Sequence, residues 1–103
     1  MLLVTTDFIP GVQFEVLGIV TGSTVRAKHM GKDFVASFRN IVGGEVTEYT
    51  EMMRESREIA TQRMMDDAAR IGADAIVGVR YTSSEIMQGS AEIMAYGTAV
   101  RYK

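Results

Sequence analysis

The fold is decided near the end of the chain, where residues 72–102 read GADAIVGVRYTSSEIMQGSAEIMAYGTAVRY. Runs rich in β-branched and aromatic residues, from Ile76 to Met87 and from Ser90 to Tyr102, predict two strands. Gln88-Gly89 lies between them, and glycine at the second position of a two-residue loop is typical of a tight β-hairpin. Gly72 is a stop signal for a preceding helix. This stretch therefore predicts a hairpin that the chain enters from a helix.

The two-residue loop also predicts a register that brings two carboxylates together. In that register Met87 lies opposite Ser90, and Glu85 lies opposite Glu92. Like charges directly across a strand pair are destabilising, so a cation, a basic side chain of another subunit, or solvent must relieve them. One interpretation is a carboxylate site for a divalent ion such as Mg²⁺, Ca²⁺ or Mn²⁺. The other is two solvated glutamates near a turn, and a three-residue loop would separate the pair.

Both faces of the predicted hairpin carry apolar side chains. One face is expected to hold Val77, Val79, Tyr81, Met94, Tyr96, Val100 and Tyr102. The other is expected to hold Ile76, Gly78, Thr82, Ile86, Ile93, Ala95, Gly97 and Ala99. The small residues of the second face favour close packing of a helix. Since one helix covers only one face of a sheet, the pattern predicts an oligomer.

The chain before the hairpin predicts four further elements. Leu2–Val4 suggests an edge strand or a docked peptide, and residues 13–28 suggest a strand that bends or breaks near Thr21-Gly22-Ser23. Asp33 is a suitable N-cap for a short amphipathic helix ending at Val42. A long helix is expected from about Thr47 to Ile71. At roughly 37 Å it is longer than strands of average length, roughly 17–20 Å, so it is expected to overhang the sheet and meet another chain. Packing of its apolar face in the core is the other interpretation of that face.

Composition excludes several classes of protein. The 103 residues predict one domain. The net charge of −2, with scattered basic residues, argues against nucleic-acid binding. Apolar runs are too short for a membrane span or a signal peptide, so a cytoplasmic location is expected. The chain has no cysteine, which excludes disulfides, thiolate catalysis and Cys-containing zinc sites.

Several of these stretches together resemble the YbjQ-like family of small bacterial proteins, which are often labelled heavy-metal-binding. The matching pieces include Leu17-Gly18-Ile19-Val20-Thr21-Gly22, Arg39-Asn40-Ile41-Val42-Gly43-Gly44-Glu45, Tyr49, Arg57, Gly72-Ala73-Asp74-Ala75-Ile76-Val77-Gly78-Val79-Arg80 and Ala95-Tyr96-Gly97-Thr98-Ala99-Val100. They span nearly the whole chain. The resemblance implies an α+β, dodecin-like β-α-β-β subunit, with a three-stranded antiparallel sheet packed on one long helix. It also implies a ring-shaped homo-oligomer, a pentamer.

Three hypotheses for function follow. The first is metal binding through Glu85, Glu92 and His29, the last being the single histidine of the chain; a soft ion would prefer thiolate or clustered imidazole ligands. The second is small-molecule binding or storage between subunits, and the third is a scaffolding ring that binds other proteins. An enzyme is not expected, because no nucleophile–base pair can be identified in the sequence.

Overall fold

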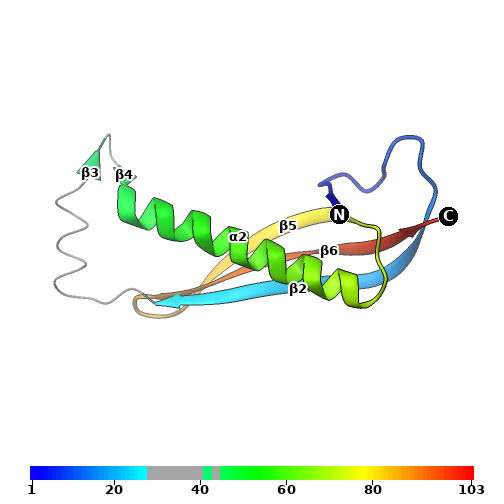
Figure 1. Cartoon of the computed structure of the whole chain (residues 1–103). Coiled ribbons are helices and arrows are strands. Elements are labelled where there is room, and N and C mark those ends of the chain that lie inside the picture. The colour runs from blue at the N-terminus through cyan, green and yellow to red at the C-terminus, as the bar shows by residue number, and fades with distance from the viewer. Residues whose placement is uncertain (28–40, 43–44) are drawn as a thin grey trace.

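The computed structural model describes residues 1–27, 41–42 and 45–103 of the chain. It is an α+β fold in which a long helix lies along one face of a four-stranded sheet (Figure 1). The sheet order is β1-β5-β6-β2, and β3 pairs with β4 separately. In chain order the elements are β1 (Leu2–Leu3), β2 (Phe14–Ala27), β3 (Ile41–Val42), β4 (Glu45–Val46), α2 (Thr47–Arg70), β5 (Ala75–Met87) and β6 (Ser90–Tyr102).

The sheet has four strands instead of the three expected. β2, β6 and β5 form the antiparallel part, as predicted. β1 adds a short parallel strand, because Leu2 pairs with Ala75 and Leu3 pairs with Ile76. Of the two alternatives for Leu2–Val4, the edge strand is confirmed. The sheet is therefore mixed. β1 covers the edge of β5 only at the start of that strand.

The predicted hairpin is confirmed, with Gln88-Gly89 as its turn. Gly89 has a φ of 77°, a left-handed conformation that glycine adopts without steric cost. Met87 pairs with Ser90 as expected, but the register shifts between Glu85 and Met87. An extra residue in one strand moves the side chains beyond it to the other face.

A second register shift in β5 lies at Gly78, between Val77 and Arg80. Gly78 has a φ of 61°, and its N–H donates to the carbonyl of Thr6 at 2.8 Å. The N-terminal segment thus bonds to the bulge. The register shift at Gly78 places Val79 and Tyr81 on the α2 side of the sheet. The expectation that they share a face with Val77 is therefore wrong.

Helix α2 ends where the sequence predicts. Gly72 has a φ of 80°, its N–H donates to the Ala69 carbonyl at 3.1 Å, and the N–H of Ala73 donates to the Ala68 carbonyl at 3.1 Å. These two bonds form a Schellman motif, which satisfies carbonyls left free by the last turn. The chain then enters β5 directly.

The buried stripe of α2 is made of small residues and one methionine: Ser56, Ala60, Met64 and Ala68 are all fully buried. Gly22 of β2 faces this stripe, and a Cβ atom at Gly22 would overlap the backbone of Ala60 and Met64. Gly22 therefore marks a close approach of the helix. The break expected near Thr21-Gly22-Ser23 is wrong, since the pairing of β2 with β6 continues through it and the bulge lies at Leu17.

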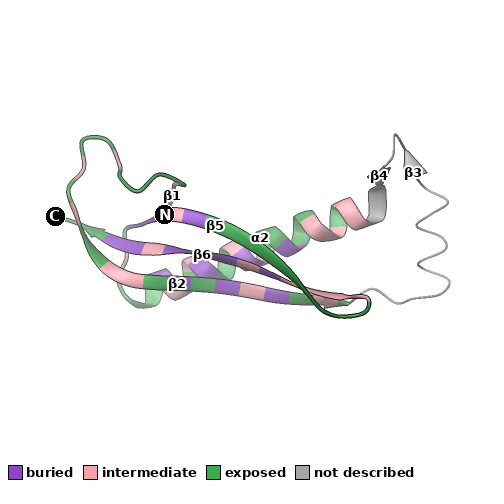
Figure 2. Cartoon of the chain, turned by 180° about the vertical axis from the view of Figure 1, so that it is seen from behind, coloured by how far each residue is buried: buried purple, intermediate pink, exposed green. Residues whose placement is uncertain are grey.

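The other face of the sheet has a smaller core at one end. There the N-terminal segment packs Val4 and Ile9 on Ala75, Val77 and Val100, which are buried. The rest of that face, which we call the open face, lies opposite α2 and carries no further segment in the part of the chain described (Figure 2).

Two expectations about the helices need correction. Strands of 13 and 14 residues span about 43–46 Å at 3.3 Å per residue, whereas the 24 residues of α2 span about 36 Å. Hence α2 is shorter than these strands, and the comparison of lengths from which an overhang was expected is wrong. The short helix expected from Asp33 to Val42 lies outside the described residues except at its end, where Ile41–Val42 form β3 instead.

We expect Gly22→Ala to destabilise the fold by at least about 1–3 kcal/mol, the usual cost of overpacking, because the new methyl group meets helix backbone that cannot rotate away. Urea unfolding followed by circular dichroism measures this cost. Ser23→Ala, the next residue of the same strand, is the control. Equal stability of the two variants would contradict the close contact.

Candidate functional site

The carboxylates predicted to face each other lie on opposite faces of the sheet. Glu85 pairs with Ala91, and Glu92 pairs with Ser84. Adjacent pairs along a ladder point to opposite faces, so the expected Glu85–Glu92 pairing is wrong. The physical reason is the register shift between Glu85 and Met87. The like-charge conflict is thereby removed within one chain.

The surroundings of these glutamates differ. Glu85 is exposed on the α2 side and lines a cavity of about 250 Å³ together with Arg26 and Tyr49. Glu92 is half-buried on the open face, opposite Val25 of β2. Among the described residues, no group of three or more His, Asp or Glu side chains is placed to hold a metal ion. His29 lies outside the described residues, so the metal-binding role of all three residues stays a prediction.

Two polar side chains of α2 bond to the outer edge of β2. Arg63 Nη1 donates to the carbonyl of Ser23 at 2.7 Å, and the N–H of Thr21 donates to Asp67 Oδ2 at 3.2 Å. The Thr21 N–H and, next, the Arg70 guanidinium at 2.7 Å hold the pKa of the Asp67 carboxyl below its usual range. An open strand edge invites pairing with another chain, and these contacts block the middle of this edge.

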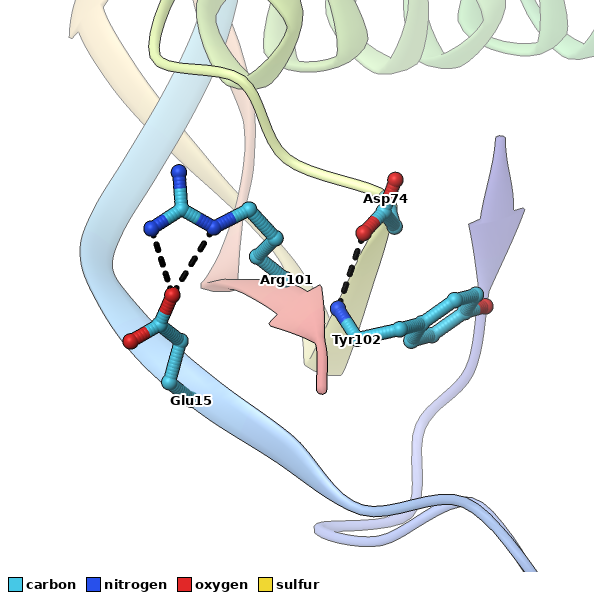
Figure 3. Close-up of polar contacts among 4 residues, drawn as sticks. All are labelled: Glu15, Asp74, Arg101 and Tyr102. Carbon is cyan, nitrogen blue, oxygen red and sulfur yellow. Dashed lines mark hydrogen bonds and ion pairs between the residues drawn. The ribbon is translucent and has the colours of Figure 1, made fainter.

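The open end of the hairpin is fastened by two side-chain contacts (Figure 3). Asp74 Oδ2 accepts the N–H of Tyr102 at 2.8 Å, so Asp74 joins the start of β5 to the end of β6. Arg101 Nε donates to Glu15 Oε1 at 2.8 Å across the β6–β2 pair. These contacts keep all three long strands in register at this end.

The open face exposes large apolar side chains outside the small N-terminal core. Ile19 is 80% exposed, Val16 65%, Val25 56% and Tyr96 39%. The strand registers place them on one face, because Ile19 pairs with Thr98 and Val25 with Glu92. Figure 2 views the sheet from this side and colours stretches of β2 and the outer half of β5 as exposed. Apolar patches of this kind mark interaction surfaces.

A groove runs on the other side of the sheet, between α2 and β5. Two cavities, of about 380 Å³ and 130 Å³, share Arg57 and Tyr81 in their linings. The sequence pattern alone does not reveal this groove. Arg57 is one of many charges on α2, and the bulge that turns Tyr81 toward the helix has no local signal beyond Gly78. The spacing of Arg57 and Thr61, four residues apart on one helix face, is the signal that was available.

The chain is similar in sequence to one family of proteins. A family model described as "Putative heavy-metal-binding" matches residues 1–103. A UPF0145 protein of Fervidobacterium nodosum is 56% identical over 104 residues, covering 100% of this chain and 96% of that protein. A UPF0145 protein of Thermus thermophilus is 55% identical over 102 residues, which cover 98% of this chain and 90% of that protein. A UPF0145 protein of Thermotoga maritima is 52% identical over 102 residues, which cover 98% of this chain and 96% of that protein.

A crystal structure of a protein of unknown function from Pediococcus pentosaceus, assigned to the DUF74 family, aligns with a TM-score of 0.71 at 15% identity, covering 100% of this chain and 98% of that one. This likeness concerns the fold alone. The chain is thus a small α+β protein built on a helix-backed hairpin. It belongs to the YbjQ family, as the full-length family match and the UPF0145 relatives show. Within the described residues, no helix is long and apolar enough to cross a membrane.

The lowered pKa of Asp67 has a consequence for stability. A carboxyl whose pKa is lowered by folding contributes stability that is fully present above its unfolded pKa, about 3.9, and is lost as the pH falls through the folded pKa. We expect Asp67→Asn to destabilise the protein at neutral pH and to flatten the stability profile between about pH 5 and pH 2. Urea unfolding at a series of pH values measures this.

The control for this prediction is Asp66→Asn, which removes the same charge one residue away on the exposed side of α2. If both variants show the same pH profile, the bond from Thr21 to Asp67 does not stabilise the strand edge.

Proposed function

We propose that the protein is a non-catalytic homo-oligomer whose subunits meet over the open face of the sheet. The observation that carries this proposal is the apolar surface of Val16, Ile19, Val25 and Tyr96, exposed in the single chain. A fully buried side chain of this size contributes about 1.5–3 kcal/mol relative to an exposed one. Covering several of them contributes favourably to association and offsets part of the entropic cost of bringing two chains together.

A second copy of this chain is the occupant that the features favour. The middle of the β2 edge is already bonded to α2 through Arg63 and Asp67, so a partner strand cannot pair along the whole of it. In the part of the chain that the structure describes, no segment covers the open face. The resemblance to a ring-forming family supports self-association, with a pentamer as the expected size. The proposal includes no catalytic role, because no nucleophile–base pair can be identified in the sequence.

We expect the protein to have the mass of an oligomer in native mass spectrometry and light scattering. Ile19→Lys should shift the mass toward the single chain, since it places a charge where apolar surface is buried between subunits. Ile71→Lys is the matched control, because Ile71 is also exposed, at 47%, but lies at the end of α2. A single-chain mass for the unmodified protein, or an unchanged mass for Ile19→Lys, would refute the assembly.

A second candidate function is metal binding by the assembled protein, which the description of the matching family favours. Glu92 is the better ligand candidate of the two glutamates, because it is half-buried on the open face where subunits would meet. Copies of Glu92 from neighbouring subunits could then supply hard oxygen ligands for a divalent ion. Glu85, on the α2 side, would not contribute.

Metal uptake is tested by native mass spectrometry of the protein incubated with Mn²⁺, Ca²⁺ or Zn²⁺. We expect stoichiometric uptake that Glu92→Gln abolishes and that Glu85→Gln, the matched control, leaves intact. Absence of uptake would remove the metal hypothesis, and equal loss in both variants would show that the ligands are not those of the open face.

A further inference from the structure

The groove between α2 and β5 exists because the helix packs at the β2 edge of this face of the sheet, away from β5. Arg63 and Asp67 bond to the outer edge of β2, and α2 packs closely on Gly22 of that strand. The outer half of β5, from Arg80 to Met87, is exposed along its whole length. The cavities of about 380 Å³ and 130 Å³ lie in this gap, and the larger one is within the size range of small-molecule sites, about 300–1,000 Å³.

Arg57, which lines both cavities, differs from the other arginines of the described residues. Four of those pair with carboxylates, namely Arg26, Arg54, Arg70 and Arg101. Two donate to backbone carbonyls, namely Arg63 and Arg80. Within the part of the chain that the structure describes, the Arg57 guanidinium has neither kind of partner. An unpaired guanidinium is a fork of donors that matches a carboxylate or phosphate group.

Tyr81 is held as a wall of the groove. The Thr61 hydroxyl donates to the carbonyl of Arg57 at 2.6 Å, and its oxygen lies 2.7 Å from the Tyr81 hydroxyl. Because the Thr61 proton is already used, Tyr81 is the donor of the second bond. The phenol proton is therefore already donated to Thr61, and this bond holds the ring of Tyr81 beside Arg57. Charge recognition falls to Arg57, and Tyr81 supplies apolar surface.

The remaining lining explains what kind of ligand fits. Ile93 and Met53 line the smaller cavity, and Met65 lines the larger; Ile93 is buried and forms the floor. Glu58 also lines the larger cavity, and its charge disfavours a ligand with several negative charges. We propose that this groove binds a small monocarboxylate with an apolar body, the carboxylate on Arg57 and the apolar body against Tyr81 and the floor. The groove lies on the opposite side of the sheet from the open face, so this site does not depend on the proposed assembly.

The test uses octanoate as the probe, with octanamide as its neutral counterpart and inorganic phosphate as an anion without an apolar body. Binding to the purified full-length protein is measured by isothermal titration calorimetry, and the site is mapped by the amide NMR shifts of Thr61, Tyr81 and Ile93. We expect saturable binding of octanoate. Octanamide and phosphate should each bind at least about tenfold more weakly, the effect of losing one charge-assisted interaction or the apolar contact.

Four variants separate the roles of the groove residues. Arg57→Gln should weaken octanoate binding by about 10- to 100-fold, whereas Lys103→Gln, which removes the same charge at the chain end, should not. Tyr81→Phe should bind nearly as the parent does, while Tyr81→Ala should lose affinity. Thermal unfolding verifies that each variant is folded. The proposal is overturned if octanoate does not bind, if octanamide or phosphate binds equally well, or if Arg57→Gln binds octanoate as the parent does.

Discussion

The close contact between the backbone of α2 and Gly22 of β2 is the constraint on which the rest of the structure depends. A side chain at that position would overlap Ala60 and Met64, so glycine lets the helix backbone approach the sheet. Once there, α2 reaches the outer strand edge with Arg63 and Asp67. The hydrophobic core forms between α2 and buried residues of β2, β5 and β6, and the small residues of β6 match this short separation.

This placement of the helix leaves two surfaces uncovered. On the α2 side, the outer half of β5 and the groove beside it hold Arg57 and Tyr81. On the other side, the described residues cover one end of the sheet with the N-terminal segment and leave Ile19 and Val25 exposed. The two surfaces have different chemistry. The groove combines an arginine that has no side-chain or carbonyl partner among the described residues with apolar walls, whereas the open face exposes Ile19 and Val25 among polar side chains.

Local signals in the sequence predicted the elements but not how β5 sits in the sheet. Gly72, the turn at Gln88-Gly89 and the apolar periodicity placed α2 and the hairpin within one or two residues of their observed bounds. The bulge at Gly78 depends on a bond to Thr6, which is distant in sequence, so no local pattern reveals it. The register shift beside Glu85 likewise separated the expected carboxylate pair. The candidate sites are therefore the groove and the open face, which tertiary packing creates, and not the expected carboxylate pair near the hairpin turn.

Two tyrosines of similar exposure in the single chain provide the most direct test of the account. Tyr96 lies on the open face and is 39% exposed, and Tyr81 lies in the groove and is 47% exposed. Hydroxyl-radical footprinting of the native protein compares their reactivity within one sample. If a second subunit covers the open face, Tyr96 reacts much more slowly than Tyr81. Equal reactivity of the two tyrosines would contradict the central claim that the open face is an interface.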